Sequence, residues 1–149
     1  MRQLLILELL ATPEAVPEVR RTLRAYLGSP CDDLQLCATE LITNVIRHLG
    51  EGVPVTVRAS CDRDRTRVEI TDPDPRALPV LCRAAGDDET GRGLTLLDAL
   101  ALRWGVEQGP GTKTVWCELP GGGDRTSPGE PSAVIRVDSE GMSVGVITG

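Results

Sequence analysis

Hydrophobic and polar positions follow two different periods along the first 119 residues of the chain. Alternation of apolar and polar side chains over 53–61 and 65–72 predicts a pair of strands. Apolar side chains recur at helical spacing over 12–27 and 32–49, which predicts two amphipathic helices. The expected elements are a strand over 4–10, helices over 12–27 and 32–49, strands over 53–61 and 65–72, a helix over 93–101, and strands over 104–108 and 112–119.

The first two predicted helices have recognisable ends. Thr12 is a capping residue and Pro13 fits the first turn of a helix, where a backbone N–H is not needed. Gly28 and Gly50 follow the last apolar positions of the two helices and predict their ends. A tight turn is predicted at 109–111, between the last two strands.

The composition changes at Pro120. A glycine-rich, proline-rich segment reaches Pro131 and predicts a flexible linker. Two short runs beyond it, 133–137 and 143–148, predict a small C-terminal hairpin. We therefore expect a domain over 1–119 and an appendage over 120–149.

The composition suits one soluble globular domain, with 149 residues of which 40% are hydrophobic. Aromatic residues make up only 2% of the chain, so the core is expected to be aliphatic and to lack stacking platforms for single-stranded nucleic acid. The net charge of −6 argues against a sequence-independent nucleic-acid binder. Lys113 is the only lysine among 16 basic residues.

Cysteines and targeting signals favour a cytoplasmic protein. The five cysteines form no C-x-x-C pair and His48 is the only histidine, which argues against a zinc site and for reduced thiols. Glu8 interrupts the apolar run near the N-terminus, so we expect no signal peptide. No stretch approaches the ~18 apolar residues of a membrane span.

Three segments carry candidate chemistry. Glu40 and Asn44 lie one turn apart on the second helix, where a carboxylate can orient a nucleophile and an amide oxygen can bind Mg²⁺; the alternative is a solvated helix face. Asp72 ends a strand and can accept a hydrogen bond from an exocyclic amine, or it simply begins an Asp-Pro turn. Residues 90–94 precede a helix and combine two glycines with an arginine, which favours an anion site or a glycine-capped junction.

One superficial likeness is rejected. Residues 109–114 read Gly-Pro-Gly-Thr-Lys-Thr, but they lack the spacing of a P-loop and lead into a strand instead of a helix. A hairpin turn explains them better.

The order of these motifs resembles that of the Bergerat-fold (GHKL-type) ATPases. It comprises Glu-x-x-x-Asn on a helix, Asp at a strand end, Gly-x-Gly before a helix, and Gly-Thr before a last strand. The predicted N-terminal strand is followed directly by a helix. This order, together with the sequences at 104–106 and 111–116, more specifically resembles the bacterial anti-sigma-factor serine/threonine protein kinases. The resemblance covers residues 4–119. It implies an α/β two-layer sandwich in which helices cover one face of a mixed, mainly antiparallel sheet.

The resemblance also implies roles for individual residues. Asn44 would be the Mg²⁺ ligand, and Glu40 would act as base or position a water molecule. Asp72 would bind the amine of adenine, and Thr112 would supply a hydroxyl near the base.

The segment before the third predicted helix would contact the phosphates of ATP. Gly91 and Gly93, followed by Leu94, would let a lid close over them, and Arg92 would contact the β- or γ-phosphate. The chain departs from the family pattern at 72–76, where Asp-Pro-Asp-Pro-Arg replaces Asp-x-Gly-x-Gly. Prolines fix the backbone and Asp74 adds negative charge, which puts nucleotide affinity in question.

The resemblance implies an ATP–Mg²⁺-binding protein kinase of a partner-switching circuit. Such a protein sequesters a sigma factor and phosphorylates an antagonist protein on Ser or Thr, with homodimerisation through sheet edges and no direct contact to nucleic acid or membrane. Two alternatives remain: a nucleotide-sensing or catalytically inactive module that sequesters a regulator, and the detached ATPase domain of a sensor histidine kinase. The single histidine and the lack of a preceding phosphoacceptor helix speak against the second alternative.

Overall fold

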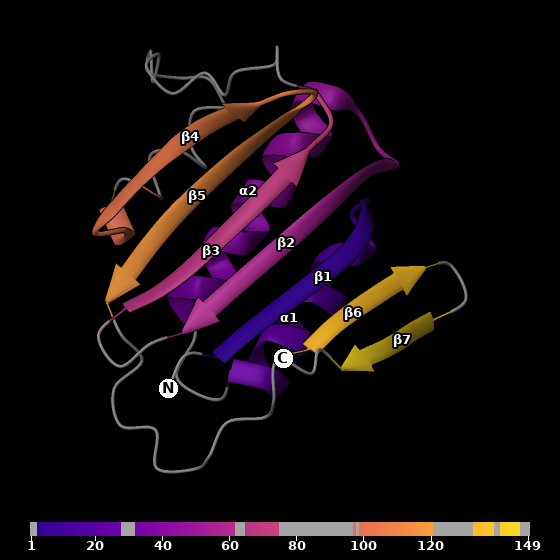
Figure 1. Ribbon diagram of the computed structural model, residues 1–149, viewed down its shortest axis with the longest axis horizontal. Coiled ribbons are helices and arrows are strands. Elements are labelled where there is room, and N and C mark those ends of the chain that lie inside the picture. Colours follow the sequence, from indigo (N-terminus) through magenta and orange to yellow (C-terminus); the bar gives the residue numbers. More distant parts are fainter. Residues whose placement is uncertain are drawn as a thin grey trace.

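The computed structural model describes residues 3–27, 32–61, 65–74, 97, 99–120, 133–138 and 141–146. It contains two helices and seven strands within these residues (Figure 1). The elements are β1 (Gln3–Ala11), α1 (Ala15–Leu27), α2 (Asp32–Leu49), β2 (Val53–Cys61), β3 (Arg65–Asp72), β4 (Arg103–Gly109), β5 (Thr112–Pro120), β6 (Ala133–Asp138) and β7 (Gly141–Val146).

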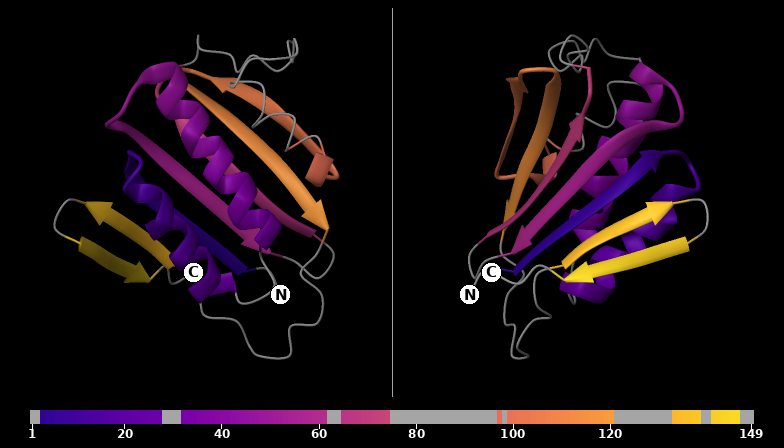
Figure 2. Two further views of the ribbon diagram at one scale, coloured as in Figure 1. Left: turned by 180° about the vertical axis from the view of Figure 1, so that it is seen from behind. Right: turned by 45° about the vertical axis from the view of Figure 1, so that its right-hand side comes forward.

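All seven strands form one sheet in the order β4-β5-β3-β2-β1-β6-β7. Every neighbouring pair is antiparallel except β1 and β6, which run parallel. The sheet is therefore mixed and mainly antiparallel. Both helices lie on the same face of this sheet, as the view from behind in Figure 2 shows. This architecture confirms the expected two-layer sandwich.

Strand alternation decides which side chains face the helices. In β1 the odd-numbered Leu5, Leu7 and Leu9 are buried, whereas Leu10 is exposed. The same period runs through β3, where Val68 and Ile70 are buried. Successive side chains of a strand point to opposite faces, so the buried set of each strand meets α1 and α2. The side chains in this core are aliphatic or cysteine, as the low aromatic content predicts.

The helix ends are formed by the predicted residues. The Oγ1 of Thr12 accepts a hydrogen bond from the backbone N–H of Ala15 at 3.2 Å, so Thr12 caps α1. The N–H of Gly50 donates to the carbonyl of Ile46 at 2.8 Å, and Gly50 has a φ of 91°. This left-handed glycine ends α2 and turns the chain into β2.

The last two strands of the predicted domain are joined as expected. β4 and β5 are each longer than predicted, by one residue at both ends of β4 and by one at the end of β5. The turn between them contains Pro110 and Gly111, and Gly111 has a φ of 75°. A proline followed by a glycine of positive φ is typical of a type II turn.

The predicted C-terminal hairpin is present as β6 and β7, and it extends the sheet. β6 pairs with β1 from Leu5 opposite Ala133 to Leu9 opposite Val137. The hairpin thereby covers the edge of β1 that would otherwise end the sheet. The domain boundary at residue 119 stays a prediction. β6 and β7, which follow it in the sequence, belong to the same sheet as β1–β5.

Several predictions fall outside the described residues. The predicted linker, which reaches Pro131, lies there, and so do residues 62–64 between the predicted strands 53–61 and 65–72. Of the predicted helix over 93–101, Leu97, Ala99 and Leu100 are described and helical, and the N–H of Ala101 donates to the carbonyl of Leu97 at 2.8 Å. Among the described residues, no helix is both long and apolar enough to cross a membrane.

Candidate functional site

Four elements, α2, β2, β3 and β5, come together at one end of the sheet. A short turn, 50–52, connects α2 to β2, so the C-terminal end of α2 lies beside the start of β2. Near that start, Thr56 lies opposite Thr71, close to the end of β3. The end of β3 in turn pairs with the start of β5 (Figure 1). This end of the fold carries three of the residues that the sequence singled out: Asn44, Asp72 and Thr112.

Asp72 is the last residue of β3, and its side chain is completely buried. It follows the buried Ile70 in the strand alternation, so it points to the side of the sheet that the helices cover. Its Oδ1 accepts a hydrogen bond from the backbone N–H of Asp74 at 2.9 Å. This hydrogen bond fixes the orientation of the Asp72 carboxylate where the chain leaves β3.

The other oxygen of Asp72 faces Lys113. The Nζ atom of Lys113 lies 3.2 Å from Oδ2, and the side chain of Lys113 is 5% exposed. The ammonium lies at ion-pair distance but outside hydrogen-bond geometry, and no other described residue donates a hydrogen bond to Oδ2. Oδ2 is thus a buried, charge-compensated acceptor without a hydrogen bond from the described part of the chain.

Lys113 is not among the site residues that the sequence predicts, although it pairs with Asp72. The register of β3 and β5 places Asp72 directly opposite Lys113 and not opposite Thr112. Two signals pointed to Lys113: it is the chain's only lysine, and it alternates in phase with the buried Val115 and Cys117. A lysine in a buried phase of a strand requires a partner, because an unpaired buried charge is costly.

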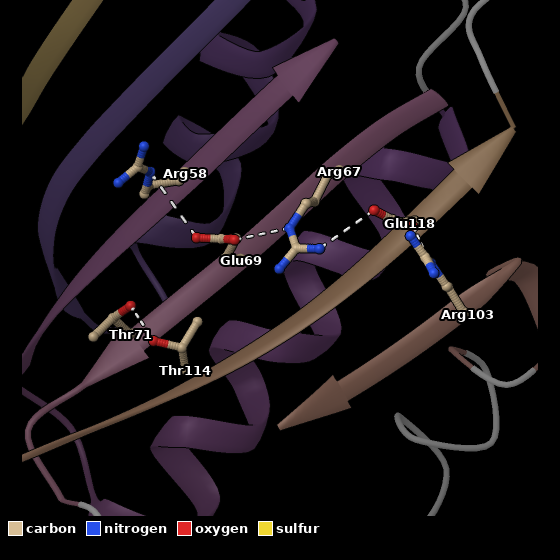
Figure 3. Close-up of polar contacts among 7 residues, drawn as sticks. All are labelled: Arg58, Arg67, Glu69, Thr71, Arg103, Thr114 and Glu118. Atoms are coloured by element: carbon tan, nitrogen blue, oxygen red, sulfur yellow. Dashed lines mark hydrogen bonds and ion pairs between the residues drawn. The ribbon is translucent and has the colours of Figure 1, made fainter. Parts of the chain in front are cut away.

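Thr112 is half-buried at the first position of β5, where its Oγ1 lies close to the backbone of Gly109. Strand alternation directs it to the opposite face from Lys113. Its neighbour on the same face, Thr114, shares a hydrogen bond with Thr71 at 2.8 Å between the two hydroxyl oxygens (Figure 3). The part that Thr112 takes in binding a base stays a prediction.

Glu40 and Asn44 lie on the flank of α2. Both are partly exposed, whereas Leu41 and Val45 next to them are buried in the core. Within the described part of the chain, neither side chain has a hydrogen bond or ion pair with another residue. Their roles toward a ligand stay predictions.

The phosphate-contacting segment lies outside the described residues. This concerns Gly91, Arg92, Gly93 and Leu94, whose roles stay predictions. Four of the eight predicted site residues are described: Glu40, Asn44, Asp72 and Thr112.

The described residues fit a purine with an exocyclic amine. An amine donates hydrogen bonds, and Oδ2 of Asp72 is a buried acceptor without one. Asn44 also fits Mg²⁺ in its donor chemistry, since an amide oxygen is a hard oxygen ligand.

The helix-free face of the sheet carries a chain of ion pairs, drawn in Figure 3. Glu69 pairs with Arg58 at 4.0 Å and with Arg67 at 2.8 Å, and Arg67 continues to Glu118 at 3.3 Å. Glu118 also pairs with Arg103. The hydrogen bond from Arg103, followed by that from Arg67, holds the pKa of Glu118 below its usual value. This network belongs to the opposite face from Asp72.

Two buried thiols connect α2 to β5 inside the core. Cys37 and Cys117 are fully buried free cysteines in side-chain contact. The contact with Cys37 and burial together raise the pKa of the Cys117 thiol. Both side chains belong to the aliphatic core between α2 and the sheet.

Comparison with known proteins gives three findings. A family model described as the histidine kinase-like ATPase domain matches residues 9–118. An uncharacterized protein of Streptomyces coelicolor is 54% identical over 85 residues, which cover 56% of this chain and 81% of that protein. The solved histidine kinase domain of the blue-light activated histidine kinase from Erythrobacter litoralis EL346 aligns with 17% identity and a TM-score of 0.45. That alignment covers 72% of this chain and 59% of the solved chain, less than two thirds of its length.

Proposed function

The chain belongs to the histidine kinase-like ATPase domain family, and from this premise we propose that it is an anti-sigma-factor-like serine/threonine protein kinase of a partner-switching circuit. Family membership implies ATP binding. Phosphoryl transfer to Ser or Thr, the use of Mg²⁺ and the regulatory partners are our proposal.

Asp72 is the observation that supports this function most directly. A completely buried carboxylate at a strand end is costly unless its oxygens are matched by donors. Oδ1 has a backbone donor, whereas Oδ2 has a charge partner without a hydrogen bond from the described residues. The exocyclic amine of adenine is a donor suited to that oxygen, so Asp72 would recognise the base of ATP.

Glu40 and Asn44 would act at the phosphate end of the nucleotide. Asn44 would hold Mg²⁺ through its amide oxygen, and the metal when bound neutralises charge on the phosphates. Glu40, one helical turn earlier, would accept the proton of the Ser or Thr hydroxyl of the protein substrate. Arg92 would stabilise the charge of the transferring group. The partly exposed position of Glu40 and Asn44 supports these roles, because a protein substrate must reach them.

The proposed partners are proteins. We propose that the chain sequesters a sigma factor, phosphorylates an antagonist protein, and works in the cytoplasm without direct contact to nucleic acid or membrane. The net charge of −6 supports the lack of a nucleic-acid surface. The sheet leaves β4 at one edge, which supports association of two copies edge to edge.

A second candidate is a nucleotide-sensing module that sequesters a regulator without phosphoryl transfer. The observation in its favour is the segment after β3, where the N–H of Asp74 binds Oδ1 of Asp72 at 2.9 Å. This turn stands where the family pattern has glycines, and it adds a carboxylate beside the predicted nucleotide. A negative charge there would repel the phosphates of a nucleotide.

Calorimetric titration with ATP and Mg²⁺ tests the proposal. We expect wild-type protein to bind ATP, and Asn44→Ala to weaken binding, because it removes the proposed metal ligand. Asp72→Ala should weaken binding by about ten- to a hundredfold, the value of one hydrogen bond to a charged group. Absence of binding at millimolar ATP would overturn the proposal, since a kinase must bind its donor.

The variant Glu40→Ala separates phosphoryl transfer from ATP binding. This variant should bind ATP like the wild type and fail to transfer the γ-phosphoryl group to a Ser- or Thr-containing protein substrate. Glu51→Ala, an exposed carboxylate in the turn after α2, is the matched control and should keep both properties. Wild-type protein that binds ATP yet transfers nothing would favour the sensing module.

A further inference from the structure

Lys113 and Asp72 form a buried ion pair across two neighbouring strands. The register of β3 and β5 sets them directly opposite each other, and their side chains are 5% and 0% exposed. Burying two charges carries a desolvation cost that a hydrophobic pair of the same volume would avoid. Core packing alone therefore does not account for this pair.

The pair leaves one hydrogen-bond acceptor open. Nζ of Lys113 approaches Oδ2 to 3.2 Å but outside hydrogen-bond geometry, and no described residue donates a hydrogen bond to that oxygen. Oδ1 is meanwhile held by the N–H of Asp74. The carboxylate is thus fixed at one oxygen and charge-balanced at the other, and a lone pair of Oδ2 stays available.

The type of cation matters for this arrangement. An ammonium is a compact point charge, whereas a guanidinium presents a planar fork that donates two parallel hydrogen bonds to a carboxylate. An arginine beside Asp72 would take up the lone pair that the lysine leaves open. Fifteen of the 16 basic residues of the chain are arginine, and the single lysine stands at this position.

We propose that Lys113 is a positioning residue for base recognition: it balances the charge of Asp72 while leaving Oδ2 open to the exocyclic amine of adenine. This inference rests on the proposed function, because it takes Asp72 as the contact to the base. Lys113 acts through the carboxylate and needs no contact of its own with the nucleotide.

The test compares two nucleotides that differ only in the amine. ATP and purine riboside 5′-triphosphate, which lacks the 6-amino group, are titrated calorimetrically into wild-type, Lys113→Met and Lys113→Arg proteins. We expect the wild type to prefer ATP by about tenfold or more, the value of one hydrogen bond to a charged group. Both variants should lose this preference, to within about twofold of equal affinity, while binding the analogue like the wild type.

The Arg variant keeps a positive charge beside Asp72, so the test does not depend on Lys113→Met alone being folded. Thr114→Val is the matched control, because it removes a hydrogen bond from the next position of β5 on the opposite face. It should destabilise the fold without changing the preference for ATP.

The outcomes separate this inference from the proposed function. Wild-type protein that binds no ATP overturns the proposed function. Wild-type protein that prefers ATP, with the same preference in either Lys113 variant, overturns the inference and leaves the proposed function standing. A merely structural lysine would lower the affinity for both nucleotides equally and keep their ratio.

Discussion

Glu118 is a nearly buried carboxylate on the helix-free face of the sheet, and three arginines surround it. Arg67 lies 3.3 Å from its carboxylate oxygens and Arg103 also pairs with it, as Figure 3 shows. Arg65 lies 3.4 Å from the same carboxylate. The arginine side chains are 28–61% exposed, so water screens part of the attraction. The pKa of Glu118 is lowered, mainly by its hydrogen bond with Arg103.

A lowered carboxyl pKa means that the folded state favours the charged form of Glu118. The stabilisation is therefore complete above the usual glutamate pKa of 4.5 and is lost as the pH falls through the lower folded value. We expect Glu118→Gln to reduce the free energy of unfolding by about 1 kcal/mol at neutral pH, with the difference from wild type shrinking as the pH falls below 4.5. Urea denaturation at several pH values measures both quantities.

The control for Glu118→Gln is Glu107→Gln, which changes an exposed carboxylate of β4. It should alter the free energy of unfolding by less than about 0.5 kcal/mol. A Glu118→Gln difference that stays constant from neutral to acidic pH would show that the charge of Glu118 is not what stabilises this cluster.

Pairing of β4 with β5 depends on a glycine beneath a tryptophan. Gly105 lies opposite Trp116, and a Cβ atom added to Gly105 would lie 2.9 Å from Cζ2 of the indole. The guanidinium of Arg67 stacks on the same indole, with its carbon 4.3 Å from the ring centroid. The indole is therefore confined between a strand backbone and a cation.

Gly105→Ala should move this indole and destabilise the fold by about 1–3 kcal/mol, the usual cost of overpacking. Chemical denaturation measures the effect. In a Trp116→Leu background the clash is removed, so the same Gly105→Ala change should cost distinctly less. If Gly105→Ala destabilised the wild type and the Trp116→Leu variant equally, the loss of stability would come from the strand backbone and not from the contact with the indole.

α2 is the element that joins the sheet to the candidate site. Its buried face packs on β3 and the neighbouring strands, and its flank carries Glu40 and Asn44. Leu41, between these two residues in sequence, is 2% exposed, whereas Leu36 on the same helix is 38% exposed. The position of Glu40 and Asn44 therefore depends on the packing of the buried face of α2 against the sheet.

Leu41→Ala should reduce the free energy of unfolding by about 2–5 kcal/mol, because it leaves a cavity under the helix. Leu36→Ala is the matched control and should cost less than about 0.5 kcal/mol. Both values follow from chemical denaturation. An equal loss of unfolding free energy in the two variants would mean that α2 does not pack on the sheet through Leu41.

At the scale of the whole molecule, the C-terminal hairpin covers one edge of the sheet. Strand β6 pairs in parallel with β1, so the edge of β1 has a partner within the same chain. An uncovered edge strand offers its backbone N–H and C=O groups to other chains. The hairpin thus limits association through β1.

A truncation after Pro120 should leave a domain that unfolds cooperatively and associates with itself more strongly than the full chain. Sedimentation velocity at several protein concentrations measures the association. Adding Leu10→Lys, a charge at an exposed position of β1, should reduce association of the truncated protein. Loss of cooperative unfolding on truncation would instead make the hairpin part of the domain and would contradict the boundary at residue 119.

The amino-acid sequence by itself determined the elements and their faces. Periodicity, short apolar runs and turn signals predicted α1, α2 and the seven strands that the described part of the chain contains. Thr12 and Gly50 marked helix ends correctly, because these signals act within a few residues. It also singled out Asp72 at a strand end. Such local signals carry no information about which strands become neighbours.

Only the tertiary structure decided the neighbours. The parallel pairing of β6 with β1 and the placing of Lys113 opposite Asp72 both depend on register between segments far apart in the chain. A shift of one residue would turn Lys113 to the other face of the sheet, and Thr112 or Thr114 would take its place beside Asp72. Burial of Val115 and Cys117 in the core fixes that register, and through it the partner of the buried carboxylate.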